Sequence, residues 1–450
     1  MNNKKISEII DLICREVKPA LGCTEPMAVS LAVSKSCEIL KEINIAPDSV
    51  EVQVSGNILK NGMGVGIPGT DMVGLYIASA LGVTCGRSEY KLEVLKDINT
   101  KAIDDAKALV DEGKIKITLA TDSAKLYIKA IVSGSNHKAE TIIKDNHDSI
   151  IYTALDGKSI LGNGNIDTDN ICIDNKYSDN KSHDNVNKEK IVEHNLAREI
   201  TVKEIYEFAT TVPFEKIEFI LESEKLNKAL SREGLKNNYG LRVGKTIASL
   251  QHNNVFGNSI LSYAMAATAA ASDARMAGCT LPAMSNSGSG NQGITVTMPV
   301  IAVAEKMDVS REALARALTI SHLVAIHIKG YLGKLSALCG CVIASTGSSC
   351  GIVYLKGGSY EQICYAIKNM IGNITGMVCD GAKVGCALKV ASGVSSSIQS
   401  AVLALDNICI SSKEGIIEDD IEKTIANLGE IGSDGMSITD KMILDIMVAK

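Results

Sequence analysis

Apolar side chains near the start of the chain repeat at helical spacing. Over residues 6–17 they recur every three or four positions, which predicts a first helix. A run of apolar residues over 27–40 predicts a second helix, with Thr24 as its first residue. We expect residues 1–45 to form a pair of helices that packs on a larger helical domain further along the chain.

A different pattern, in which apolar and polar residues alternate, follows the second helix and predicts strands. Helical spacing returns twice within this region, over 70–81 and over 100–112. The alternating stretches are 50–54, 115–133 and 138–153. We therefore expect residues 46–162 to form an α+β domain with a mostly antiparallel sheet.

The rest of the chain divides into a polar segment and a long helical region. Residues 163–190 are dense in Asn, Asp and Lys and can bury little apolar surface, so we interpret 163–195 as a flexible insertion or linker. Over 196–450 the apolar spacing is helical, and Ser359 with Gln362 predicts a capping box. The predicted fold class is therefore α+β, with a sheet domain joined to a larger all-helical catalytic domain.

Composition narrows the classes of partner. The chain has 450 residues, a net charge of −6 and 4% aromatic residues. It has neither the basic surplus that binds a nucleic-acid backbone nor the aromatic platforms that stack on bases. The uncharged stretch 335–355 is long enough to span a membrane, but its Ser, Thr and Gly suit a buried helix pair better. We expect a small-molecule substrate and no membrane span, and a homo-oligomer is compatible with this composition.

Cysteine is the residue type that stands out. The chain has 13 cysteines, an odd number, and its first 17 residues lack the apolar core of a secretory signal. We therefore expect reduced thiols and a cytoplasmic location, with cysteines used for packing, catalysis or metal binding. Six of the cysteines lie between positions 339 and 386.

Cys23 is the first candidate for chemistry. It directly precedes the helix predicted to start at Thr24, and the free N–H groups and positive dipole end of a helix start favour a thiolate. Such a thiolate would be a base or a nucleophile. The alternative is a small buried residue at a turn between two helices.

The second candidate is the polar loop GCTLPAMSNSGSGNQG at 278–293. Hydroxyl, amide and backbone N–H groups at this density can bind an anion such as a carboxylate. The residues predicted to do so are Ser285, Asn286, Ser287, Ser289 and Asn291. The alternative is an ordinary solvated loop, and Cys279 within it is open between metal ligation and packing.

The third candidate is a late group of cysteines, Cys339, Cys341, Cys379 and Cys386. A set of soft thiolates suits zinc or an iron–sulfur cluster. Their spacing matches no zinc ribbon or ferredoxin pattern, so packing alone is also an explanation.

Two further patterns carry less information. The glycines of GVGIPG at 64–69 have the form of a dinucleotide-binding fingerprint, but the proline within it and the antiparallel sheet favour a tight loop near a small ligand. Several charges stand in uncharged surroundings, and one of them could face an anionic substrate. These charges are Arg275, Lys329, Lys334 and Lys383.

Five motifs together resemble the L-cysteine desulfidase family, which is distantly similar to the iron–sulfur L-serine dehydratases. The motifs are GCTEP at 22–26, NGMGVGIPGT at 61–70, SNSGSGNQG at 285–293, LCGCVIAS at 338–345 and GMVCDGAKVGC at 376–386. The resemblance covers nearly the whole chain except the polar insertion.

The resemblance implies one [4Fe–4S] cluster per chain, held by three cysteines with one iron left open. It implies an α,β-elimination that converts L-cysteine to pyruvate, ammonia and hydrogen sulfide without pyridoxal phosphate, with Cys23 as proton acceptor. Cys379 and Cys386 match two cluster ligands, and the remaining ligand is Cys339 or Cys341, of which we favour Cys339. The polar loop would hold the substrate carboxylate, which requires the Cys23 segment to fold back onto the helical domain.

Three alternatives remain. The same cluster chemistry serves an L-serine dehydratase-type deaminase, because the same amino and carboxylate groups would be recognised. A non-enzymatic metal protein that senses thiols or redox state would use the same cysteines. A pyridoxal-phosphate lyase needs a Schiff-base lysine, and the sequence singles none out.

Overall fold

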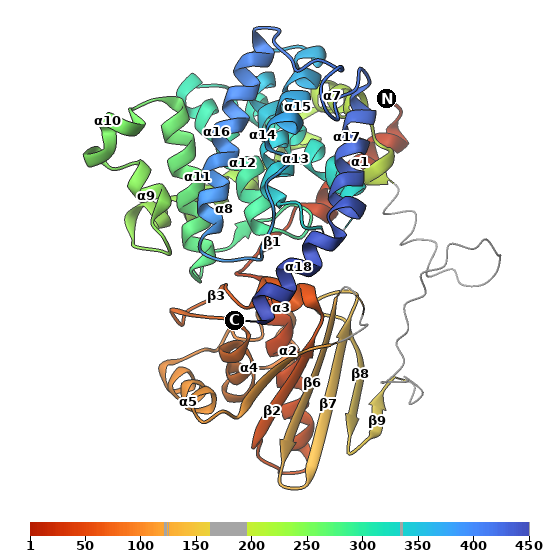
Figure 1. Ribbon diagram of the computed structural model, residues 1–450, viewed down its shortest axis with the longest axis vertical. Coiled ribbons are helices and arrows are strands. Elements are labelled where there is room, and N and C mark those ends of the chain that lie inside the picture. Colours follow the sequence, from red (N-terminus) through yellow and green to blue (C-terminus); the bar gives the residue numbers. More distant parts are fainter. Residues whose placement is uncertain (121–123, 125, 163–195, 334–335, 450) are drawn as a thin grey trace, which may run out of the picture.

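The computed structural model describes residues 1–120, 124, 126–162, 196–333 and 336–449. The chain forms a sheet-containing part at one end and a larger helical part at the other (Figure 1), and each part has its own hydrophobic core. The predicted α+β class is therefore confirmed. The polar segment 163–195, interpreted from the sequence as a linker, and Lys334 lie outside the described residues.

Within the described residues, the main sheet has six strands in the order β5-β2-β6-β7-β8-β9. These strands are β2 (Ser49–Val54), β5 (Ile115–Leu119), β6 (Tyr127–Gly134), β7 (His137–Lys144), β8 (Ile150–Leu155) and β9 (Lys158–Leu161). Neighbours are antiparallel except β2 and β5, which pair in parallel because a helical crossover joins them. Val50, Val52 and Val54 all face the core, as their alternation predicted.

Two of the predicted helices flank this sheet. Helix α2 (Thr24–Glu42) packs on β6 and β7, and α4 (Leu75–Thr84) packs on β5, with α5 (Thr100–Asp111) against α4. Helix α1 (Asn3–Glu16) instead contributes to the core of the helical part. The expectation that both N-terminal helices pack on the helical part is therefore wrong for α2. Helix α2 is apolar around most of its circumference, so it is buried between the sheet and α4.

The helical part is built around three largely buried helices, α12 (Gly290–Met307), α13 (Arg311–Leu332) and α14 (Gly340–Leu355). Besides α1, the other helices of this part among the described residues are α7 (Val202–Thr211), α8 (Glu222–Lys236), α9 (Val243–Ile247), α10 (Asn253–Phe256), α11 (Ile260–Met276), α15 (Tyr360–Ile374), α16 (Cys386–Leu405), α17 (Ile421–Glu430) and α18 (Ser437–Val448). Short turns of other helix types are η1 (Ser88–Glu93), η2 (Phe214–Lys216), η3 (Glu218–Leu221), η4 (Leu250–His252) and η5 (Ile431–Gly435). The capping box predicted at Ser359 and Gln362 begins α15.

The uncharged stretch at 335–355 belongs mainly to α14, which packs between α12, α13 and α16 as a core helix. One helix of the described residues, α16, is long and apolar enough by composition to cross a membrane, and half of it is buried inside the protein. Burial of this kind is also what a core helix of a globular protein shows.

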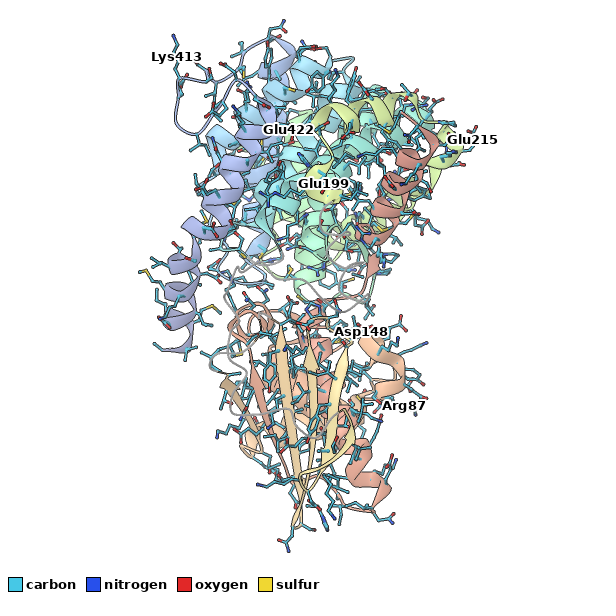
Figure 2. All side chains as sticks on the ribbon, turned by 90° about the vertical axis from the view of Figure 1, so that its right-hand side faces the viewer. Arg87, Asp148, Glu199, Glu215, Lys413 and Glu422 are labelled. Carbon is cyan, nitrogen blue, oxygen red and sulfur yellow. The ribbon has the colours of Figure 1, made fainter. Side chains whose placement is uncertain are left out.

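Two short strand pairs lie at the junction between the parts. Strand β1 (Pro19–Ala20) pairs with β10 (Ala283–Met284), which ties the segment before α2 to the helical part. Strands β3 (Gly66–Ile67) and β4 (Met72–Val73) form a hairpin that reaches the end of α11. Figure 2 shows Asp148, in the turn between β7 and β8, at the end of the sheet nearest the helical part.

The helix predicted over 70–81 starts later, at Leu75, because a turn precedes it. The Thr70 hydroxyl donates to Ile67 O (2.8 Å) and accepts from the Met72 N–H (3.1 Å). Gly74, with φ of 99°, then separates β4 from α4. The glycine-rich segment 64–69 therefore leads into and forms part of a hairpin, and it is not the strand-to-helix turn of a dinucleotide site.

Helix α18 also connects the two parts. It runs from the helical part down to α3 (Gly56–Gly62), as Figure 1 shows. The ammonium group of Lys60 pairs with Asp440, and Leu444 lies against Gly56. Lys60 is only 4% exposed, so its partner on α18 balances a buried charge at the junction.

Candidate active site

Cys23 lies at the N-cap of α2, one residue before Thr24, as the sequence predicted. Gly22, with φ of 60°, turns the chain into this position. The Cys23 thiol is buried, and its Sγ donates a hydrogen bond to Glu25 Oε2 at 2.9 Å. The thiol is therefore paired with a carboxylate that can accept its proton.

The surroundings of Cys23 do not stabilise a thiolate. Burial, and then the negative charge of Glu25, raise the pKa of the Cys23 thiol well above its usual range, and the positive charge of Arg275 acts in the opposite direction. The expectation that the helix start favours a thiolate is therefore wrong for this thiol as it lies here. Burying a charge costs more than a helix start contributes. For Cys23 to act as a base, another group must first accept its thiol proton. The Glu25 carboxylate is in contact with the thiol and can do so.

The N-terminal segment folds back onto the helical part, as the hypothesis of a carboxylate-binding loop requires. The Ser285 N–H and hydroxyl both donate to Lys18 O, at 2.8 and 2.6 Å. The Ser287 N–H donates to Glu16 O at 2.9 Å. These bonds, with the β1–β10 pair, join the polar loop and the segment before Cys23 into one unit.

A buried amide network holds the polar loop. Asn286 is fully buried, and its Nδ2 lies 3.0 Å from His322 Nδ1 on α13. Its Oδ1 accepts from Gln292 Nε2 (2.7 Å) and from the Ser287 hydroxyl (3.0 Å). Burial lowers the pKa of His322 to about 3, so the ring is neutral at physiological pH and can accept a hydrogen bond from the amide.

The five predicted loop residues therefore fall into two groups. Ser285 and Asn286 are buried and already hydrogen-bonded within the protein, so they position the loop. The others remain partly exposed and have capacity for a ligand. These are Ser287, Ser289 and Asn291.

Arg275 is the isolated charge that the structure brings to this region. It is buried at the end of α11, where its guanidinium donates to Gly22 O (2.8 Å) and lies 3.4 Å from Asn291 Oδ1. Of the other charges that have uncharged neighbours in the sequence, Lys329 lies near the end of α13, and Lys383 pairs with an aspartate in the late cysteine segment.

Two of the late cysteines lie on adjacent extended segments joined by an antiparallel bridge. The Cys339 N–H donates to Met377 O at 3.0 Å. The Cys379 N–H donates to Ala337 O at 2.6 Å. Cys386 begins α16, and its pKa is raised by burial and, in the same direction, by a charge on Cys379. Three thiols that are distant in the sequence are therefore neighbours.

Cys341 makes packing contacts of its own, although it also lies near Cys386. Its Sγ donates to Lys389 O (3.2 Å) and lies 3.5 Å from the Ser345 hydroxyl. A side chain on Gly393 of α16 would overlap this sulfur, so the thiol fills the contact between α14 and α16. These contacts give Cys341 a packing role, and the choice of Cys339 as the first ligand stays a prediction.

Cys279, which the sequence left open, is buried in the helical core. It lies against Tyr239 and contributes, after burial and Glu233, to raising the pKa of that hydroxyl. Its surroundings favour packing over metal ligation.

Cys23 and Cys386 belong to one small hydrophobic cluster. Cys23, Val65 and Met276 form its buried centre, and Cys386 packs against it. A backbone bridge between Gly64 and Lys383 links the same two regions. The candidate base and one candidate cluster ligand therefore lie together at the junction of the two parts.

Comparison with known proteins bears on this arrangement. Residues 89–445 match the family described as serine dehydratase alpha chain, which covers most of the chain. The chain belongs to the serine dehydratase alpha chain family. It is 48% identical to a UPF0597 protein of Bacteroides thetaiotaomicron over 98% of both chains, and 47% identical to one of Bacteroides fragilis over 100% of both. A UPF0597 protein of Oleidesulfovibrio alaskensis is 46% identical over 99% of this chain and 98% of its own. These names specify no substrate.

Membership of the serine dehydratase alpha chain family indicates a lyase-type enzyme, and proteins of this family generally bind a [4Fe–4S] cluster. In the part of the chain that the structure describes, no group of three His, Cys, Asp or Glu side chains converges on one ion position. A cubane cluster does not need such convergence, because each cysteine binds a different iron.

The residues present fit such a cluster in type and surroundings. Cys339, Cys379 and Cys386 are free thiols. Burial raises the pKa of the Cys339 thiol well above its usual range. Lys389, which donates to Val378 O (2.8 Å) and pairs with Asp380, has a positive charge that acts in the opposite direction. This cation offsets part of the cost of forming the thiolate that binds iron.

Two contacts near the candidate site were not predictable from the motifs alone. Glu25 received no role, although an acidic residue two positions after a helix-start cysteine is a local signal that could have suggested one. The contact of His322 with Asn286 has no signal in the sequence, because His322 lies on α13 and Asn286 in the polar loop, and the two share no local pattern.

Proposed function

We propose that this member of the serine dehydratase alpha chain family is a cytoplasmic L-cysteine desulfidase that uses a [4Fe–4S] cluster. The observation that carries the proposal is the shared location of Cys23 and Cys386, since α-proton removal and leaving-group departure must occur at one substrate. The sequence motifs support L-cysteine as the substrate. The net charge of −6 and a free amino acid as substrate both argue against a nucleic-acid partner.

The proton steps fall to Cys23 and Glu25. Glu25 Oε2 accepts the Sγ proton, and the thiolate formed takes the α-proton of the substrate. The raised pKa of the Cys23 thiol makes this transfer necessary, because the thiol does not ionise in neutral water. The electron pair of the broken Cα–H bond forms the Cα=Cβ bond as the Cβ–S bond breaks. The enamine then becomes an imine, and water hydrolyses it to pyruvate and ammonia.

Cys339, Cys379 and Cys386 would hold the cluster, which supplies a Lewis-acidic open iron for the departing sulfur when it is bound. Lys389 keeps its ammonium group beside the segments that carry these ligands. The polar loop orients the substrate through Ser287, Ser289 and Asn291.

The proposal is tested by comparing substrates. Protein purified without oxygen and carrying iron and sulfide should turn over L-cysteine with a kcat/KM at least about 10-fold above that for L-serine, because an open iron is a better partner for sulfur than for oxygen. A higher kcat/KM for L-serine would instead support a deaminase with the same site. Iron binding without turnover of either amino acid would support a thiol- or redox-sensing protein.

A further inference from the structure

Arg275 is a buried cation that has no carboxylate within ion-pair distance among the described residues. It is 7% exposed, and no ion pair of the described residues includes it. The guanidinium donates to the carbonyl of Gly22 and contacts Asn291 Oδ1 at 3.4 Å, and its buried Nε has no hydrogen-bond partner. Neutral acceptors compensate a buried charge poorly, so an anion is missing from this arrangement.

The start of α12 adds to the positive potential at the same place. Gly290 and Asn291 are its first residues, and their N–H groups have no acceptor within the helix. Arg275 Nε lies so close to Gly290 that any side chain there would overlap it. A guanidinium and a positive helix end therefore face one another, and a helix start of this kind binds carboxylates and other anions.

Arg275 also lies where it could bind the carboxylate end of an amino acid while the α-carbon is near Cys23. Arg275 binds the carbonyl of Gly22, the residue before Cys23, and its charge acts on the Cys23 thiol. In an α-amino acid, the carboxylate is bonded to the carbon whose proton is removed. A carboxylate held by Arg275 would therefore bring the α-proton toward Cys23.

We propose that Arg275 and the N-terminus of α12 bind the α-carboxylate of the substrate and orient its α-proton toward Cys23. The inference deepens the proposed function and rests on it for the identity of the amino acid. It makes Arg275 the residue that selects free amino acids over their amides and esters. Gly290 is then required because it lets the guanidinium approach the helix start.

The test measures binding without turnover, with L-alanine as a ligand that lacks a leaving group and L-alaninamide as its neutral counterpart. By calorimetry on the cluster-containing protein, L-alanine should bind and the amide should bind at least about 10-fold more weakly. Arg275→Gln should raise the Kd for L-alanine by roughly 10- to 100-fold, because it removes a charge-assisted bond. The Kd of Arg275→Lys for L-alanine should lie between those of the wild type and Arg275→Gln. Lysine keeps the positive charge but cannot make the paired hydrogen bonds of a guanidinium group.

Arg316→Gln is the matched control, because Arg316 is also largely buried and donates to Ala209 O while pairing with Glu312. Its Kd for L-alanine should equal that of the wild type. Equal binding of acid and amide by the wild type would overturn the inference without any variant, as would unchanged binding by folded Arg275→Gln. Arg275-dependent binding of L-alanine in a protein that releases no sulfide would leave the inference standing and remove the proposed reaction.

Discussion

A thiol buried beside a carboxylate loses its proton reluctantly to water but can pass it directly to its neighbour. This is the situation of Cys23 and Glu25, whose atoms are 2.9 Å apart. The helix start was predictable because capping patterns are local. The raised pKa was not, because it depends on how deeply the tertiary fold buries the turn.

Glu25→Gln tests this proton transfer. We expect kcat/KM for L-cysteine to fall by about 100-fold near neutral pH, because an amide cannot accept the thiol proton. The remaining activity should increase with pH, since ionisation of a thiol with a raised pKa then limits the reaction. Glu38→Gln, at the other end of α2, should keep the wild-type pH profile. A Glu25→Gln profile identical to that of the wild type would contradict the role of Glu25.

The buried carboxyl group of Asp273 leads to a prediction about the pH dependence of stability. Its Oδ2 accepts from the Gly244 N–H (2.9 Å), its Oδ1 is buried without a partner, and burial raises its pKa to about 6. Because the pKa is raised on folding, the stability that this group contributes in acid is lost as pH rises through 6. The unfolding free energy of Asp273→Asn minus that of the wild type should therefore increase by about 1–2 kcal/mol as the pH rises from 5 to 8. Urea unfolding at both pH values measures this, and a pH-independent difference would exclude it.

Helices and strands with a regular spacing of apolar residues were predictable from the sequence. Elements whose ends are fixed by a turn were not. The strand over β2 and the start of α2 follow from alternation and capping. The start of α4 does not, because Thr70 and Gly74 form a turn and a second short strand first. The choice between Cys339 and Cys341 likewise depends on the bridge that runs into α14 and on the contact with Gly393, which no local pattern encodes.

Replacing each of these two cysteines separates their roles. Cys339→Ser should lose most of the iron and acid-labile sulfide per chain, because a thiolate ligand is replaced by a poor one. Cys341→Ser should keep the wild-type iron content, since its sulfur fills a helix contact. Iron analysis and visible absorbance after anaerobic purification measure the cluster content of both variants. The opposite pattern would make Cys341 the ligand.

For the whole molecule, the site depends on how the two parts meet. The β3–β4 hairpin of the sheet-containing part packs on the end of α11, immediately after Arg275 and Met276. Such long-range contacts cannot be derived from periodicity, although the fold-back of the N-terminal segment followed from the chemistry that the motifs imply.

Gly66→Ala tests this junction. A Cβ there would overlap the backbone of Ala277 and Gly278, so we expect a loss of about 1–3 kcal/mol in unfolding free energy and a fall in kcat/KM. Gly435→Ala is the control, because its Cβ would meet only ordinary contact distances. Equal stability and activity of the two variants would show that the hairpin contact does not support the site.

The central claim is that Cys23 acts on L-cysteine beside a cluster held by the late cysteines. The most direct measurement is the release of sulfide and pyruvate from L-cysteine by anaerobically purified wild type and Cys23→Ser with matched iron content. The wild type should release the two products in equal amounts, and Cys23→Ser should release almost none. Sulfide release by Cys23→Ser at the wild-type rate, or none from iron-replete wild type, would contradict the claim.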